Sequence, residues 1–115
     1  MKTLNLLIAL TFFGFSVFAQ QEASSKKTET IEILTSAVCG MCKDKIEITL
    51  YGLKGVKSAT LDVPSKVVTV KYKPADVTPE QLRTAISLSG YDANEIPADP
   101  QAYEKLHACC KKGAH

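Results

Sequence analysis

Residues 30–50, TIEILTSAVCGMCKDKIEITL, decide the fold of this chain because a strand pattern changes into a helix pattern within them. Apolar Ile31 and Ile33 alternate with polar Glu32, and this period of two is typical of a half-buried strand. From about Lys43 onward, apolar residues recur at spacings of four and three, which is typical of a helix with one buried face. The stretch therefore predicts a strand, a loop and a helix, in this order.

Two cysteines stand at this junction, in the motif Cys39-Gly40-Met41-Cys42. A helix start presents unpaired backbone N–H groups and the positive end of the helix dipole, and both favour a thiolate over a thiol. The thiolate is the form of cysteine that binds metal ions. The same spacing also occurs in redox enzymes and in half of many zinc sites, so the rest of the chain must decide between these uses.

Further elements follow the first helix, which we expect to end at the glycines 52 and 55. Residues 56–63 and 66–72 are rich in β-formers and predict a hairpin. Thr78 is the expected N-cap of a second helix that runs to about Gly90. Residues 91–96 predict a short closing strand. The side chains expected to face inward are Ile46, Leu50, Leu53, Ala59, Leu61, Val63, Val68, Val70, Tyr72, Leu82, Ala85 and Ile86.

The predicted order of elements is strand, helix, strand, strand, helix, strand. This order is the ferredoxin-like βαββαβ arrangement, an α+β sandwich in which two helices cover one face of a four-stranded antiparallel sheet. In that topology the first loop between strand and helix lies at the edge of the sheet. We therefore expect Cys39 and Cys42 near the surface rather than in the core.

Composition limits the classes of protein to consider. A length of 115 residues with 45% hydrophobic residues predicts a single globular domain. The net charge is only +2, from 14 basic and 12 acidic residues, so nothing in the charge favours a nucleic-acid partner.

The first residues of the chain have the pattern of a targeting segment. Lys2 is followed by an apolar run over residues 4–18, and small residues precede a cleavage position after Ala19. We expect residues 1–19 to be a signal peptide and residues 20–28 to be a polar linker. The expected location is periplasmic or secreted, with no stable membrane anchor after cleavage. A retained membrane anchor is the alternative, although the apolar run is shorter than the ~20 residues of a spanning helix.

Residues 30–96 resemble the heavy-metal-associated domain, a family that includes small copper chaperones, the amino-terminal modules of metal ATPases and periplasmic mercuric-ion-binding proteins. We assign the domain itself to residues 29–96. The resemblance implies that Cys39 and Cys42 bind one soft metal ion, and that Tyr91 lies beside the site without being a ligand. The residues that carry the resemblance are Cys39, Cys42, Ile46, Leu50, Gly55, Val56, Val68, Thr69, Val70, Ser89, Gly90 and Tyr91.

The chemistry of two thiolates favours copper(I), with mercury(II) or zinc(II) as alternatives. Thiolates select soft ions, and a pair of protein ligands suits copper(I) or mercury(II) better than zinc, which takes four. Together with the resemblance, this predicts a metal carrier that passes its ion to a membrane metal transporter or a P-type ATPase. We expect a monomer, with a metal-bridged dimer as the alternative. Lys43 beside the site could offset the negative charge of a bis-thiolate complex, or it could simply be solvated.

One position departs from the family pattern. The family usually has a methionine two residues before the first cysteine, and this chain has Ala37 there, while Met41 lies between the cysteines. We expect Met41 to turn inward and fill the missing volume, because flexible thioethers commonly fill gaps in cores. The alternative is that Met41 acts as a weak third ligand for copper(I).

Residues 97–115 form a tail that contains both remaining cysteines. A short helical pattern would let His107 and Cys110 face one point, so that His107, Cys109 and Cys110 could bind metal. If these residues fold back onto the loop, zinc or cadmium becomes credible because the number of ligands rises. The alternatives are a disulfide from Cys109 or Cys110 to the first pair, or a disordered end.

Two other classes of function compete with the metal carrier. One is a periplasmic thiol-disulfide oxidoreductase that uses Cys39 and Cys42, although the chain lacks the extra crossover of a thioredoxin-like sheet. The other is an adaptor module in which the cysteines form a clip, but a clip between Cys39 and Cys42 would constrain little chain. No catalytic constellation is recognisable in the sequence, so we predict that the protein is not an enzyme.

Overall fold

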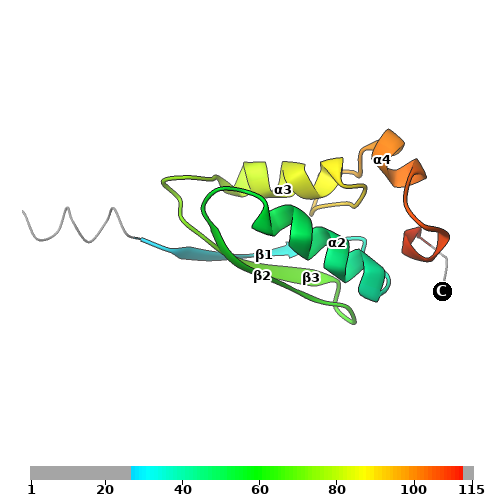
Figure 1. Cartoon of the computed structure of the whole chain (residues 1–115), viewed down its shortest axis with the longest axis horizontal. Helices are drawn as coiled ribbons and strands as arrows, with labels where there is room; N and C mark the ends of the chain where they lie inside the picture. Colours follow the sequence, from blue (N-terminus) through cyan, green and yellow to red (C-terminus); the bar gives the residue numbers. More distant parts are fainter. Residues whose placement is uncertain (1–26, 113–115) are drawn as a thin grey trace, which may run out of the picture.

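The computed structural model describes residues 27–112, so the predicted signal peptide and most of the predicted linker lie outside the described residues. Within this part the fold is α+β, with helices on one face of an antiparallel sheet (Figure 1). The elements are β1 (Glu29–Leu34), α2 (Gly40–Tyr51), β2 (Val56–Asp62), β3 (Val67–Tyr72), α3 (Pro79–Leu88), α4 (Pro100–Glu104) and a short 3-10 turn, η2 (Ala108–Cys110).

The sheet of the described residues has the order β1-β3-β2, with both neighbouring pairs antiparallel. Ile33 on β1 and Leu61 on β2 both lie opposite Val68 on β3. All three side chains are buried beneath the helices, as the alternating pattern predicts. The core is formed mainly by Ile33, Ile46, Leu50, Ala59, Leu61, Val68, Val70, Tyr72, Leu82, Ile86 and Tyr91.

The first helix begins three residues before the position that the sequence predicts. The prediction placed its start near Lys43, whereas α2 begins at Gly40 with Cys39 as its N-cap. Glycine and methionine at the start of α2 do not continue the apolar period, which explains why the pattern missed this first turn. As a result Cys42 lies inside the helix, on the side that also buries Ile46 and Leu50.

The second helix, α3, confirms its predicted start. The Thr78 hydroxyl accepts a hydrogen bond from the Gln81 backbone N–H at 3.1 Å, and the Gln81 side chain accepts one from the Thr78 backbone N–H at 2.9 Å. This reciprocal capping box fixes where α3 begins. Leu82 and Ile86 face the core as predicted, while Ala85 is only partly buried. Among residues 27–112, no helix combines the length and apolar character needed to cross a bilayer.

The predicted fourth strand is not confirmed. Residues 91–96 contain only isolated bridges, from Ala93 to Thr35 and to Ile96. The Leu34 backbone N–H donates to the side-chain oxygen of Asn94 at 2.9 Å, and the Asn94 backbone N–H donates to the Leu34 carbonyl at 2.8 Å. Asn94 also has a positive φ of 52°. A side-chain amide thus replaces a backbone carbonyl in the pairing with β1, and the segment turns away.

The described part of the tail, residues 97–112, returns to the start of α2. Figure 1 shows α4 beyond the end of α3 and η2 beside the first turn of α2. Gly90 makes this path possible: its φ is +107°, and a Cβ there would lie 3.1 Å from the Ala102 carbonyl oxygen and from Leu106 Cδ2. The tail is therefore a folded part of the molecule over these residues, with Leu106 buried against the domain.

Candidate metal site

Two hydroxyl side chains hold the loop between β1 and α2. The Thr35 hydroxyl donates to the Lys66 carbonyl at 2.8 Å and accepts from the Ala37 backbone N–H at 3.2 Å. The Ser36 hydroxyl accepts from the Asp92 backbone N–H at 2.9 Å. These bonds fix the backbone just before Cys39. The sequence interpretation missed both residues, although a Thr-Ser pair directly after a strand is a known signal for such turns.

Cys39 and Cys42 lie close together, with their sulfur atoms 3.5 Å apart. The expectation that both would be near the surface is wrong for Cys42, which has no exposed surface, and Cys39 is partly buried. Cys42 points toward the core because α2 begins early, and η2 packs beside this first turn. The pair is thus a mostly covered site at the end of a helix.

The position of Cys39 at the helix start favours its thiolate. Its sulfur makes no capping hydrogen bond of standard geometry. Nevertheless, the nearby backbone N–H of Cys42 is the main cause that lowers the pKa of Cys39 to about 6, against the opposing effect of burial. The Cys42 thiol and the Met41 backbone N–H act in the same direction. Cys39 is therefore largely a thiolate at neutral pH, ready to bind a cation.

The tail brings its two cysteines to the same place. Cys110 Sγ lies 3.8 Å and Cys109 Sγ lies 3.9 Å from Cys39 Sγ, and none of the four cysteines forms a disulfide. The sulfur atoms of Cys39, Cys42 and Cys110 all lie within 4.8 Å of one another. Burial is the first cause that raises the pKa of Cys110 to about 12, so this group is protonated before any metal binds.

His107 does not join this cluster. It is the residue that precedes η2, its side chain is exposed, and its carbonyl accepts a hydrogen bond from the Cys110 backbone N–H at 2.8 Å. The sequence placed His107 and Cys110 on one side of a continuous helix, but α4 ends at Glu104 and η2 is a separate turn. Within the described residues, the cluster that could hold a metal ion is made of cysteines alone.

Tyr91 lies beside the cluster, where the family resemblance places it. The side chain is completely buried, and its hydroxyl has no hydrogen bond of standard geometry within residues 27–112. Burial is the main cause that raises the pKa of Tyr91 far above its usual range, and the thiols of Cys42 and Cys110 lie near enough to add to this effect. The hydroxyl therefore remains protonated and is available to donate a hydrogen bond to a thiolate.

The inward turn expected for Met41 does not occur. Ala37 is fully buried, while Met41 remains 48% exposed and its sulfur accepts from the Cys109 thiol at 3.4 Å. Met41 therefore lies at the outer edge of the cysteine cluster and not beneath the loop.

Lys43 lies on α2 but pairs with a carboxylate. Its ammonium group forms an ion pair with Glu47, four residues along the helix. The same Glu47 carboxylate accepts from the Leu61 backbone N–H at 2.7 Å. Lys43 is therefore paired within α2, and Glu47 is the residue that links α2 to β2.

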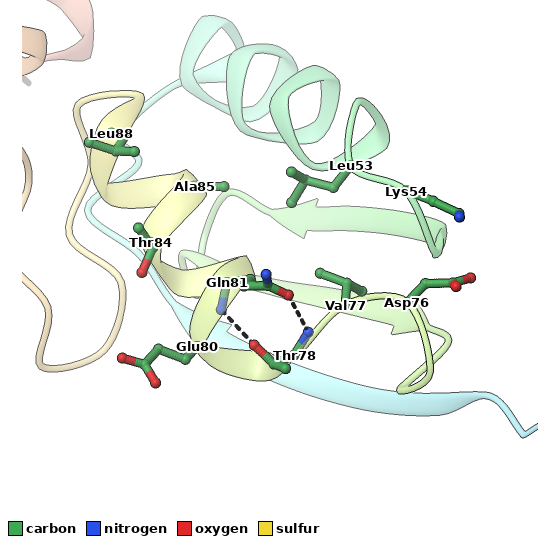
Figure 2. Close-up of a pocket in the computed structure, with 10 residues that line it drawn as sticks. All are labelled: Leu53, Lys54, Asp76, Val77, Thr78, Glu80, Gln81, Thr84, Ala85 and Leu88. Carbon is green, nitrogen blue, oxygen red and sulfur yellow. Dashed lines mark hydrogen bonds between the residues drawn. The ribbon is translucent and has the colours of Figure 1, made fainter.

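A groove elsewhere on the molecule carries no comparable chemistry. It has a volume of about 600 Å³ and lies between α3 and the segment that follows α2 (Figure 2). Leu53, Val77, Ala85 and Leu88 supply apolar walls, and Lys54, Asp76 and Glu80 lie around it. Its side chains include no cysteine and no histidine, so a soft metal ion would find no ligand there.

Comparison with known proteins agrees with this geometry. Residues 36–92 match the model of the heavy-metal-associated domain. The chain is 30% identical in sequence to the structure of the CopZ metallochaperone, with a TM-score of 0.55, and covers 98% of that protein and 56% of its own length. The chain belongs to the heavy-metal-associated domain family.

Other relatives of this heavy-metal-associated domain are parts of transport proteins. It is 29% identical to the N-terminal domain of a potential copper-translocating P-type ATPase from Bacillus subtilis, solved in the Cu(I)-loaded state, with a TM-score of 0.57 over 59% of this chain and 86% of that one. It is also 34% identical over 67 residues, 57% of this chain, to a copper-exporting P-type ATPase of Staphylococcus aureus. The match spans only 8% of that ATPase.

Proposed function

We propose that this protein is a carrier of copper(I) that binds the ion with Cys39 and Cys42 and passes it to a membrane transporter. The observation that carries the proposal is the pair of sulfur atoms 3.5 Å apart at the start of α2, one of them in a position that favours its thiolate. Thiolate ligands select soft ions such as copper(I). The relation to CopZ and to a Cu(I)-loaded ATPase domain supports copper over mercury(II) or zinc(II).

The partner and the location follow from the same proposal. A P-type ATPase is the proposed acceptor, because domains of this family occur in such ATPases. Transfer would proceed by ligand exchange without any catalytic group of the carrier, so we infer that the protein is not an enzyme.

The signal-peptide pattern of residues 1–19 supports a periplasmic or secreted location. Cell fractionation and sequencing of the N-terminus of the mature protein test this location. A cytoplasmic protein that still begins at Met1 would contradict it.

The metal assignment is tested by anaerobic competition for copper(I) between the reduced protein and a chromophoric chelator. The wild-type chain should take one copper(I) ion per molecule from the chelator. The double variant Cys39→Ser/Cys42→Ser should lose this ability, because both proposed ligands are removed. Thr84→Ala is a control, because Thr84 is exposed on α3 and its replacement leaves the cysteine loop unchanged. Retention of copper(I) by the double variant would refute the site.

A thiol-disulfide oxidoreductase is the second candidate, because a cysteine with a pKa of about 6 beside a second thiol is also the arrangement of a redox pair. The order of the sheet, β1-β3-β2 with antiparallel neighbours, gives no support to a thioredoxin-like architecture. An insulin-reduction assay separates the two functions. Sustained turnover with dithiothreitol, lost in Cys39→Ser, would favour the oxidoreductase over the carrier.

A further inference from the structure

The tail is held in place by contacts that do not involve sulfur. The Asp99 backbone N–H donates to the Ser87 carbonyl at 2.9 Å, and the Ser87 hydroxyl donates to the Pro97 carbonyl at 2.7 Å. Leu106 is only 7% exposed and packs closely over Gly90. These contacts attach α4 and the residues around it to the end of α3. The path of the tail toward the cysteine loop is therefore set by the fold.

The end of the tail is attached as well. The Lys112 ammonium lies 2.6 Å from the Asp92 carboxylate, and the Lys112 backbone N–H donates to the Tyr103 hydroxyl at 2.9 Å. Cys110 lies between these attachments and Leu106, and it is 4% exposed. A ligand positioned by its own scaffold binds without a large ordering cost, so Cys110 is already placed to act on an ion at Cys39 and Cys42.

The distances between the sulfur atoms suit three ligands better than two. With a metal–thiolate bond of about 2.3 Å, taken from zinc sites, two sulfurs on opposite sides of an ion stand ~4.6 Å apart, and three sulfurs in a plane around it stand ~4.0 Å apart. Cys39 Sγ lies 3.5 Å from Cys42 Sγ and 3.8 Å from Cys110 Sγ. A planar site therefore needs a small expansion of the cluster, whereas a linear pair needs a larger one.

The buried Tyr91 hydroxyl is an independent observation that points to the same site. It lies beside Cys42 and Cys110 and makes no hydrogen bond of standard geometry within the described residues. A buried donor without a well-aligned acceptor is unfavourable. A thiolate formed at Cys42 or Cys110 when metal binds would accept a hydrogen bond from this hydroxyl more strongly than the neutral thiol does.

We propose that Cys110 is a third thiolate ligand of the copper(I) site, so that the tail of residues 97–112 closes the site over its ion. This inference rests on the proposed function, because it takes Cys39 and Cys42 as the other two ligands. The tail then retains the ion until an acceptor arrives. Cys109 Sγ also lies 3.9 Å from both Cys39 Sγ and Cys110 Sγ. However, Cys109 is only partly buried and its thiol donates to Met41 Sδ at 3.4 Å, whereas Cys110 is 4% exposed, so Cys110 is assigned as the ligand and Cys109 is not.

Release then begins at Cys110. A cysteine thiol of the acceptor loses its proton and forms a bond to copper(I), while the bond from copper(I) to Cys110 breaks and the Cys110 sulfur takes up a proton. The ion keeps its charge and three sulfur ligands throughout this exchange. Because the third ligand comes from the tail, the tail must move away before the acceptor's second thiolate replaces Cys39 or Cys42.

X-ray absorption spectroscopy of the full chain loaded with one equivalent of copper(I) tests the proposal. The wild-type protein should show three sulfur neighbours for each copper ion, and Cys110→Ala should show two. Alanine suits the buried position, because serine would bury an unpaired hydroxyl. Cys109→Ala is the matched control and should keep three. Two sulfur neighbours in the wild type, or three in Cys110→Ala, would overturn the proposal, as would a loss confined to Cys109→Ala.

Affinity gives a second measurement. Loss of groups that merely orient a metal ligand typically lowers affinity about 10- to 100-fold, so loss of the Cys110 thiolate should weaken copper(I) binding at least about tenfold. Cys109→Ala should bind as the wild type does. Equal affinity of all three proteins would contradict a third ligand.

The wild-type chain alone provides a test that does not depend on how the variants fold. In the copper-loaded protein, an alkylating reagent should modify Cys109 but not Cys39, Cys42 or Cys110, and mass spectrometry of fragments identifies each position. Modification of Cys110 with copper retained would overturn the proposal while leaving the proposed function intact. Failure of the wild type to bind copper(I) would instead refute the proposed function, and this inference with it.

Discussion

At the scale of single residues, the position of each cysteine explains its chemistry. Cys39 precedes the first turn of α2, where backbone N–H groups lower its pKa, while burial raises the pKa of Cys110. The sequence predicted thiolate character for the cysteines near a helix start, although the periodic pattern placed this start near Lys43 and not at Gly40. The burial of Cys110 could not be predicted, because it depends on contacts between the tail and residues more than 60 positions earlier.

The pKa difference predicts which thiol reacts first in the metal-free, reduced protein. The pKa of Cys39 is lowered to about 6, so its thiolate predominates above that pH and is lost as the pH falls through 6. Iodoacetamide should therefore modify Cys39 with a rate that rises to half its plateau near pH 6. Cys110, with a pKa of about 12, should stay unmodified at neutral pH.

Mass spectrometry of peptide fragments measures each rate separately, and the protein unfolded in urea is the control. In urea, the modification rates of all four cysteines should reach half their plateau at about pH 8.5, the ordinary pKa of a thiol. A Cys39 midpoint at this ordinary value in the folded protein would contradict the role given to the start of α2.

At the scale of elements, the sequence predicted those features that depend only on residues close together in the chain. The alternation of β1, β2 and β3 and the capping box of α3 could all be read from neighbouring residues. The segment of residues 91–96 has apolar residues at strand spacing, but the side chain of Asn94 bonds the backbone of Leu34 and takes the place of a regular ladder. This replacement of a backbone partner by a side chain depends on a tertiary contact, so the sequence pattern alone could not show it.

The capping box of α3 allows a quantitative prediction. Thr78→Ala removes the hydroxyl that accepts from Gln81, and the free energy of unfolding should fall by about 1 kcal/mol. Thr84→Ala is the control, because Thr84 is exposed within the same helix and its replacement should change the free energy of unfolding little. Urea denaturation under reducing conditions measures both. Equal stabilities of the two variants would contradict the role of the cap.

At the scale of the whole molecule, the tail joins the far end of the chain to the start of α2. Leu106, Cys110 and the Lys112–Asp92 ion pair attach it to the domain. Folding of the tail back onto the cysteine loop is one of three alternatives that the sequence leaves open. In the structure, the tail does lie against this loop. This is why the site is more covered than the topology alone predicts.

The anchoring of the tail predicts a link between stability and metal retention. Leu106→Ala removes a buried side chain, so the free energy of unfolding should fall by about 2–5 kcal/mol. Copper(I) affinity should fall as well, because Cys110 loses its support. Leu88→Ala is the matched control, since Leu88 is 64% exposed. Denaturation measures the free energy of unfolding, and copper(I) competition measures the affinity. A loss of stability with unchanged copper(I) affinity would show that the tail does not support the metal site.

The central claim is that one soft ion binds among the sulfur atoms at the start of α2. A copper(I) titration of the isotope-labelled, reduced protein followed by NMR tests it most directly, because each backbone N–H reports its own surroundings. The account predicts that shifts saturate at one equivalent and concentrate at Cys39–Lys43, Tyr91 and Cys110. Saturation with changes centred on the groove beside α3, and none at Cys39 and Cys42, would contradict it.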